Sequence, residues 1–265
     1  MIVSGLKALY AAQTAFAFHG DYSKELCAKH RTSEYLPNID HIGCRSMSAS
    51  REVRENLRLH EEPFVCASGV PDSFVEKYTA SGETHEFENS LSILTAVRLV
   101  ASKSIGAVIK ASARALPAEK YSLTIAGEGP LIDEYQTYAR EHSLTNTVFF
   151  LGRISREMLQ ERMQASDVFV LISRGETFGL VYIEAMLHGC IVVASRFGGV
   201  DGILVDGENG FLCNAGDEAE LASVLLHTAS LSVEKKKKIS RSAIETAKNN
   251  TDSKVAARYL AQITV

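Results

Sequence analysis

The sequence contains no tryptophan, and aromatic residues make up only 8% of its 265 positions. Its net charge is −4, so there is no excess of positive charge to neutralise a nucleic-acid backbone. Apolar residues account for 46%, enough to build a sizeable core in a chain of this length. The composition therefore argues against nucleic acid as a partner and predicts an ordinary globular protein.

Cysteine is also scarce. The five cysteines are widely scattered, form no C-x-x-C pair and make no cluster with histidine at the spacing of a zinc site. An odd number of separated thiols is typical of a reducing compartment. We therefore expect a cytoplasmic location.

Long apolar runs are absent too. No stretch reaches 18 uninterrupted apolar residues, which argues against a membrane-spanning helix. The partly apolar start, MIVSGLKALYAAQTAFAF, contains a lysine and lacks a signal cleavage pattern, so we interpret it as core structure. The run Lys235 to Lys238 is interpreted as a solvated helix face. The alternative is a peripheral membrane contact through anionic lipid, at ~1 kcal/mol per lysine.

From residue 91 onward, short apolar runs alternate with helix-like stretches, the pattern of successive βαβ units. Six runs are predicted as strands, at 91–97, 121–127, 147–152, 167–173, 191–195 and 210–213. Helical patterns are predicted at 103–116, 131–142, 156–165, 180–188 and 217–229. The fold class is therefore α/β, with a complete Rossmann-like parallel sheet.

The region before this sheet has a different pattern. Residues 1–75 have shorter apolar runs and are predicted to form a truncated, second Rossmann-like portion. The stretch 71–90 is rich in Ser, Thr and Glu, so we predict a linker or exposed loop there and place the domain boundary at 76–90. The main domain would then be 91–249, followed by a short amphipathic helix within 250–265.

In an open parallel sheet, ligands bind at the carboxyl ends of the strands. The loop SRGETFG leads directly into a helix, which leaves free backbone N–H groups near Phe178, Gly179 and Leu180. The helix dipole would favour a phosphate there by ~0.3–1 kcal/mol. Arg98 and Lys103 follow the first strand and would add charge-assisted bonds of roughly 1.5–3 kcal/mol each. The pattern predicts a pyrophosphate cradle.

Two glutamates flank this helix start. Glu184 lies one turn after Leu180 in a mostly apolar helix, where a carboxylate needs a partner, and it would accept two hydroxyl bonds from a ribose. Glu176 precedes the helix and would reach the sugar side. The residues alone thus predict a phosphate-ligand domain and leave the ligand open.

These residues resemble the GT-B glycosyltransferases of family 4, a retaining group that uses nucleotide-diphosphate sugars. Glu176 and Glu184 match the family's E-x7-E arrangement within S-x-x-E-x-F-G-L-V-x-x-E-A-M, and Gly198 and Gly199 continue it. LTAVRLVASKSIGAVIKA is similar to the family's G-R-L-x-x-x-K-G segment. FLGRIS, which contains Arg153, is similar to the loop that usually packs against the base.

The resemblance implies a role for each of these residues. Arg98 and Lys103 would stabilise the departing nucleotide diphosphate, Glu184 would hold the ribose, and Glu176 would contact the donor sugar. AFAFHGD resembles a strand of the family's first domain and would bring His19 near that sugar.

The resemblance also implies the reaction. A sugar would pass with retention from a nucleotide sugar to a glycan or lipid-linked acceptor, in glycan or polysaccharide biosynthesis. No metal or cofactor is expected, and the sequence has no D-x-D signature to contradict this. Catalysis would rest on positioning and charge stabilisation. The final VAARYLAQI resembles the helix that crosses back to the first domain.

The sequence departs from the family pattern in four places. Val97 and Ser104 replace glycines beside the two basic residues, and Asp201 and Gly202 stand where Pro-Glu is usual. The region 1–75 is also much shorter than the family's first domain, so strands that normally bind the acceptor are missing. The alternative hypothesis is therefore a non-catalytic or half-complete nucleotide-sugar-binding protein that needs a partner glycosyltransferase chain.

Two other enzyme classes fit less well. A dinucleotide oxidoreductase would need a third glycine where GEGPLI has Ile132, and that turn follows the second strand instead of the first. A nucleotide-sugar epimerase of the same architecture would need carboxylate and histidine signatures that we do not recognise in this chain.

Overall fold

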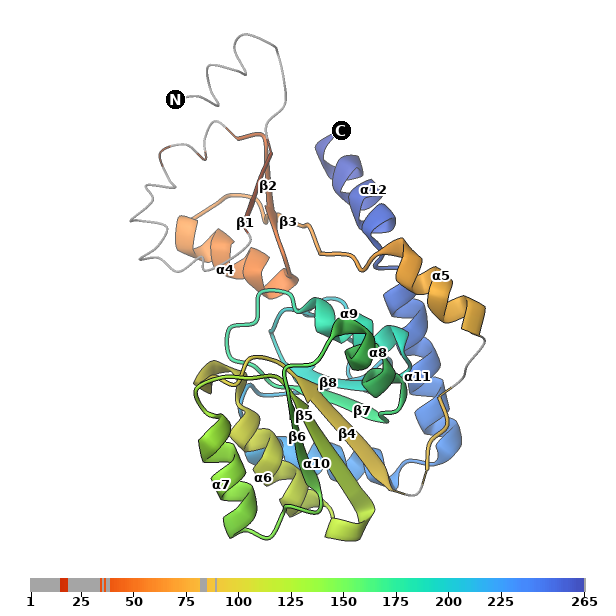
Figure 1. The fold of residues 1–265 in the computed structure, drawn as a ribbon. Helices are drawn as coiled ribbons and strands as arrows, with labels where there is room; N and C mark the ends of the chain where they lie inside the picture. The colour runs from red at the N-terminus through yellow and green to blue at the C-terminus, as the bar shows by residue number, and fades with distance from the viewer. Residues whose placement is uncertain are drawn as a thin grey trace.

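The structure is a computed structural model that describes residues 15–18, 34, 36, 39–81, 85–88 and 90–264. Two parallel sheets organise these residues, a small one toward the N-terminus and a large one flanked by helices (Figure 1). The small sheet has the order β1-β2-β3, and the large sheet has the order β6-β5-β4-β7-β8-β9. The predicted α/β class, with one complete Rossmann-like sheet and a smaller second portion, is confirmed.

The described strands are β1 (Ala15–Phe18), β2 (His41–Cys44), β3 (Phe64–Val65), β4 (Leu91–Ala96), β5 (Tyr121–Ala126), β6 (Val148–Gly152), β7 (Val168–Leu171), β8 (Ile191–Ser195) and β9 (Phe211–Cys213). The described helices are α4 (Met47–Leu57), α5 (Asp72–Ser81), η2 (Ala101–Lys103), α6 (Ile105–Ala115), η3 (Ala118–Lys120), α7 (Ile132–Glu141), α8 (Arg156–Gln164), α9 (Leu180–Leu187), α10 (Glu218–Ser230), α11 (Val233–Lys248) and α12 (Asp252–Ile263). The six strands predicted from residue 91 onward are all present, each within two residues of its predicted bounds.

Helices cover both faces of the large sheet, which is why its strands appear in the sequence as unbroken apolar runs. α6, α7 and α10 lie on one face and α8, α9 and α11 on the other, each group with its own buried apolar cluster. The chain enters the sheet at β4, extends it on one side with β5 and β6, and then on the other with β7, β8 and β9. The loops after β4 and β7 therefore lie at the topological switch point, where such sheets bind ligands.

The last helix, α12, returns to the small sheet (Figure 1). Val70 and Thr251 form a parallel bridge, and Asp252 N donates a hydrogen bond to Val70 O at 2.9 Å. The ring of Tyr259 in α12 lies 5.7 Å from that of Phe64 in β3. These contacts join the small sheet to the C-terminal segment. Among the described helices, none has the length and apolar content needed to cross a membrane.

Part of the stretch 71–90 is helical, and the expectation of a linker or exposed loop is wrong there. Residues Asp72–Ser81 form α5. Phe74, Val75 and Tyr78 pack against the apolar cluster of α8, α9 and α11. The i, i+1, i+4 spacing of these three residues gives the helix one apolar side. The many polar residues between and after them made the stretch resemble a loop in the sequence.

The lysine run in α11 is only partly solvated. Lys236 is 5% exposed, so the solvated-face interpretation is wrong for this residue. It lies on the same helix side as Ile239, Ser240 and Ala243, which face the large domain. The aliphatic stem of a lysine can pack along apolar surface in this way. Lys237 forms an ion pair of 2.9 Å with Glu86.

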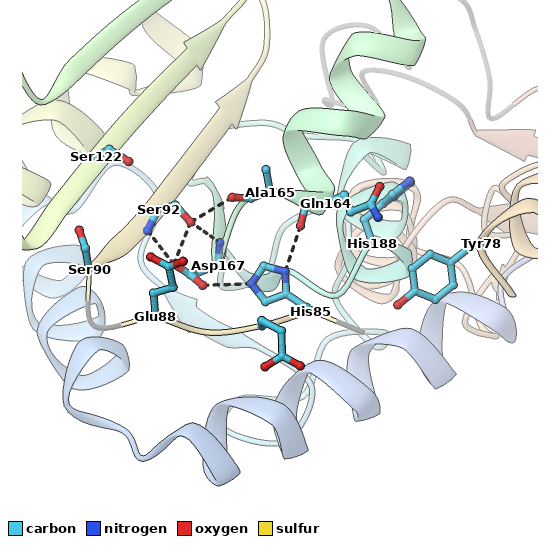
Figure 2. Close-up of a pocket in the computed structure, with 11 residues that line it drawn as sticks. Tyr78, His85, Glu88, Ser90, Ser92, Ser122, Gln164, Ala165, Asp167 and His188 are labelled. Carbon is cyan, nitrogen blue, oxygen red and sulfur yellow. Dashed lines mark hydrogen bonds and ion pairs between the residues drawn. The ribbon is translucent and has the colours of Figure 1, made fainter. Parts of the chain in front are cut away.

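A polar cluster lies at the amino ends of the large sheet's strands (Figure 2). His85 Nε2 lies 3.0 Å from Asp167 Oδ1, and His85 Nδ1 lies 3.1 Å from Gln164 O. Asp167 Oδ2 accepts hydrogen bonds from Ser92 N at 2.7 Å and from Ser92 Oγ at 2.8 Å. The cluster borders a hollow of ≈540 Å³. Because these groups bond to one another, they anchor the segment 85–88 to the sheet.

Replacing Asp167 with Asn should lower the free energy of unfolding by about 1–3 kcal/mol, because an amide has one acceptor oxygen where the carboxylate has two. Urea unfolding followed by circular dichroism measures this. Asp133→Asn, at an exposed position in the first turn of α7, is the control and should change stability by less than about 0.5 kcal/mol. Equal losses in the two variants would contradict a stabilising role for the cluster.

Ser104, between η2 and α6, has a left-handed backbone. Its φ is 54° and its ψ is 32°. A side chain in this region costs roughly 1–2 kcal/mol relative to glycine. The serine that replaces the family's glycine thus has a conformation that glycine adopts without strain.

Ser104→Gly should therefore stabilise the protein by about 1 kcal/mol. The increase in Tm measures this effect. The control is Ser102→Gly two positions earlier, whose φ is not positive, and which should destabilise by about 0.5–1 kcal/mol because glycine has a more flexible unfolded state. Changes in Tm of the same sign in both variants would contradict the interpretation that the Ser104 backbone is strained.

Candidate functional site

The loops after β4, β5 and β7 are joined backbone to backbone at the carboxyl edge of the large sheet. Arg174 N donates a hydrogen bond to Ser102 O at 2.7 Å, which joins the β7 loop to the β4 loop. On the other side, a Cβ at Gly127 would lie only 1.9 Å from Val97 O. The close approach at Val97 is thus provided by a glycine on the neighbouring loop. The predicted phosphate loops lie at one edge, held in register by their backbones.

The start of α9 is an uncapped helix N-terminus at this edge. Gly179, with φ 75°, is the N-cap residue, and no side chain caps the helix. A Cβ at Gly179 would lie 2.5 Å from the ring of Tyr182, so a larger residue would clash. Phe178 is buried at 4% exposure, whereas Leu180 is exposed at 36%. The structure thus brings Phe178, Gly179 and Leu180 to a helix start with free donors, as the sequence predicts.

Lys103 and Glu176 form an ion pair in front of this helix start. Lys103 Nζ lies 2.6 Å from Glu176 Oε2, and both side chains are largely buried. Lys103 ends η2, and Glu176 lies in the loop that the Arg174 backbone bond holds against it. Two predicted site residues therefore meet, and in the described structure they pair with each other.

Glu184 is in a second ion pair. Its side chain is 9% exposed, and its Oε1 lies 2.5 Å from Arg156 NH2. The expectation that a carboxylate in this apolar helix needs a partner is correct, but Arg156 was not among the predicted site residues. Arg156 is the first residue of α8 and lies 4.6 Å above the ring of Phe74 in α5. The sequence signal that could have pointed to Arg156 is its place directly after Ser155, which caps α8.

Arg98 and Arg153 lie at the rim of the site. Both are exposed, and within the described part of the chain neither guanidinium forms a hydrogen bond or an ion pair. Arg98 follows β4 and Arg153 follows β6, so they flank the β5 loop. The predicted His19 lies outside the described residues.

The loop after β8 contacts both the α9 start and α4. A Cβ at Gly199 would lie 2.4 Å from Phe178 O, so this glycine allows two backbones to touch. Ser48 Oγ donates to Gly198 O at 3.2 Å. Asp201 accepts from Arg51 at 3.0 Å. Asp201 and Gly202, which replace the usual Pro-Glu, therefore face α4, since a Cβ at Gly202 would lie 2.4 Å from Met47 Sδ.

The thiol at this edge of the sheet is buried. Cys213 ends β9, and burial raises the pKa of its thiol to about 12, so the thiol stays protonated and is a poor nucleophile. Among the described residues, no group of three or more His, Cys, Asp or Glu side chains is arranged to hold a metal ion. What the site offers is cations, a helix N-terminus and two carboxylates, a set suited to a phosphate-containing ligand with hydroxyl groups.

The chain is similar to several known glycosyltransferases. It is 34% identical over 203 residues to an uncharacterised glycosyltransferase of Methanocaldococcus jannaschii, covering 72% of this chain and 51% of that protein. It is 30% identical over 120 residues to the N-acetyl-alpha-D-glucosaminyl L-malate synthase of Bacillus anthracis, covering 45% of this chain and 31% of that one. The chain thus spans about half or less of the curated relatives it matches.

A solved structure shares the fold. The Anabaena protein HepE in complex with UDP superimposes with a TM-score of 0.79 at 21% identity, covering 97% of this chain and 74% of that one. The predicted GT-B architecture is confirmed. The family model described as Glycosyl transferases group 1 matches residues 77–246, more than half of the chain. The chain therefore belongs to the group 1 glycosyl transferases.

Proposed function

We propose that this chain binds a nucleotide-diphosphate sugar at the start of α9 and serves as the donor-binding part of a family 4 retaining glycosyltransferase. The observation that supports this most is the uncapped N-terminus at Gly179, flanked by two carboxylate-cation pairs. A diphosphate would accept hydrogen bonds from the free N–H groups. HepE, one of the proteins that share this fold, was crystallised with UDP.

In this proposal, donor binding exchanges the partners of both ion pairs. The diphosphate would draw Lys103 away from Glu176, and the freed carboxylate would turn to the donor sugar. The ribose hydroxyls would replace Arg156 on Glu184. Arg98 would neutralise part of the negative charge on the departing diphosphate. This is the group that gains negative charge in the transition state.

The remaining expectations belong to the same proposal. The acceptor would be a glycan or a lipid-linked acceptor, in the synthesis of a glycan or polysaccharide in the cytoplasm. The further partners in this proposal are a membrane surface, contacted peripherally, and a second glycosyltransferase chain. Transfer would need neither metal nor cofactor, because charge stabilisation comes from Arg98, Lys103 and the α9 N-terminus. Retention would be read from the anomeric signals of the product by NMR.

Lys103→Ala and Glu184→Ala should each weaken binding of the cognate nucleotide diphosphate by about tenfold or more, because each removes one charge-assisted contact. Titration calorimetry with UDP, GDP and ADP measures this and also identifies the base. Lys238→Ala, at an exposed position of α11, is the control and should bind like the wild type. Turnover of the sugar donor should fall in Lys103→Ala and Glu184→Ala and should stay at the wild-type level in Lys238→Ala.

Equal affinities across the three variants would contradict the site assignment. Wild-type binding of none of the three diphosphates would contradict the proposed function itself. Binding without any transfer by the chain alone would support the alternative in which a partner chain completes the acceptor site.

Arg156→Met should lower the free energy of unfolding by about 1–2 kcal/mol, because it leaves the carboxylate of Glu184 buried without a partner. The loss is modest because half of the Arg156 side chain is already exposed to solvent. The same variant should bind the nucleotide diphosphate as well as or better than the wild type, because the ribose no longer competes with Arg156. Thermal unfolding and calorimetry measure the two effects.

Arg162→Met, at an exposed position in the last turn of α8, is the matched control and should leave both stability and affinity nearly unchanged. An Arg156→Met variant that loses both stability and nucleotide affinity would show that Arg156 supports the ligand directly, and the exchange at Glu184 would be wrong.

A further inference from the structure

Arg45 is a half-buried cation whose partners are all uncharged. It directly follows β2 in the small sheet, and the next residue, Ser46, is the N-cap of α4. Its guanidinium donates to Ser68 Oγ and, at 3.5 Å, to Cys66 O. Within the described part of the chain, no carboxylate lies within ion-pair distance of it. A half-buried charge held this way lacks a counter-ion.

The Arg45 guanidinium lies near the ring of the residue that precedes the N-cap of α9. Its central carbon is 5.8 Å from the centroid of the Phe178 ring. Phe178 directly precedes Gly179, the N-cap residue of α9. The small sheet therefore contributes a cation to the helix start at which the large domain presents its free N–H groups. The contact is supported beside it by Ser48, which bonds Gly198 O.

Three positive groups at this edge of the molecule have no carboxylate partner of their own in the described structure. The N-terminus of α9 has a partial charge of roughly +0.5. Arg98 makes no ion pair in the described structure, and Arg45 has only neutral partners. Lys103 differs, because Glu176 already neutralises it. Like charges gathered in this way repel one another until an anion binds between them.

We propose that Arg45 binds the diphosphate of the nucleotide, so that the anion bridges the small sheet and the large domain. This inference rests on the proposed function and adds to it a contact from the N-terminal portion of the chain. The guanidinium of Arg45 has five N–H donors. Two of them bond to Cys66 O and Ser68 Oγ and orient the group, and the others are available for phosphate oxygens. The donor would then hold the two parts of the molecule together, and Arg45 would stabilise charge on the departing diphosphate.

A purely structural role for Arg45 makes a different prediction. If it only joined β2 to the Ser68 segment, its removal would affect all ligands alike through a loss of stability. A contact to phosphate depends on the number of phosphates in the ligand. The comparison of a nucleoside with its mono- and diphosphate therefore separates the two roles.

The experiment measures affinities of the full chain for uridine, UMP, UDP and inorganic pyrophosphate by calorimetry, with the guanosine or adenosine series in place of uridine if the wild type prefers that base. Arg45→Gln should weaken UDP and pyrophosphate by about tenfold, UMP less, and uridine not at all, as expected for one lost charge-assisted contact. Arg45→Lys keeps the charge and should restore most of the affinity.

Arg51→Gln is the matched control. Arg51 also joins the small sheet's portion to the large domain, through Asp201 at 3.0 Å, but its partner is a carboxylate and not the α9 start. All four ligands should bind this variant within about twofold of the wild type, since an exposed ion pair contributes little. A loss of UDP affinity equal to that of Arg45→Gln would show that the interface, and not the Arg45 charge, matters.

Wild-type UDP affinity in Arg45→Gln would overturn the inference and leave the proposed function standing. An equal loss for uridine and UDP would overturn it too, because it would indicate a structural effect. Ser68→Ala provides a milder variant should Arg45→Gln not fold: it frees the guanidinium from one anchor, and it should weaken UDP two- to threefold without affecting uridine. No difference between UDP and uridine in that variant would also contradict the proposal. Absence of any diphosphate binding by the wild type would instead refute the proposed function.

Discussion

The hydrogen bond from Arg174 N to Ser102 O fixes the geometry on which the site depends. It joins the loop after β7 to the loop after β4, at the point where the strand order of the sheet changes direction. Lys103 follows Ser102 by one residue, and Glu176 follows Arg174 by two. The 2.6 Å contact between these side chains is therefore a consequence of backbone packing. Gly179, with φ 75°, then leads the chain into α9 at a position where a side chain would clash with the Tyr182 ring.

Charge is balanced unevenly across this edge. Lys103 and Glu184 each have a partner of opposite sign, whereas Arg45, Arg98 and the α9 N-terminus have none in the described structure. The paired groups are stable without ligand, and the unpaired ones favour an anion. An anionic ligand would relieve this imbalance. The site is thus arranged to gain more from a diphosphate than from a neutral sugar.

The two parts of the molecule meet at the same place. The loop after β8 contacts α4 through Gly198, Asp201 and Gly202, and its Gly199 lies on the backbone of Phe178. Both positions that depart from the family's Pro-Glu pair touch α4. A ligand bound at the α9 start would therefore lie next to the contact between the two parts, where small changes in domain position change its surroundings.

The sequence by itself determined the large sheet and the location of its binding edge, because both depend on local patterns. Alternating apolar runs predict strands and helices within a few residues, and the glycine before Leu180 predicts a free helix start. Short-range patterns also showed that Glu184 needs a partner, but not which residue provides it. Only the tertiary structure decided that Arg156, 28 positions earlier, meets Glu184, that Arg45 reaches Phe178, and that Lys236 is buried. Those contacts join segments far apart in the chain, and their geometry follows from how the helices pack on the sheet, which no local pattern records.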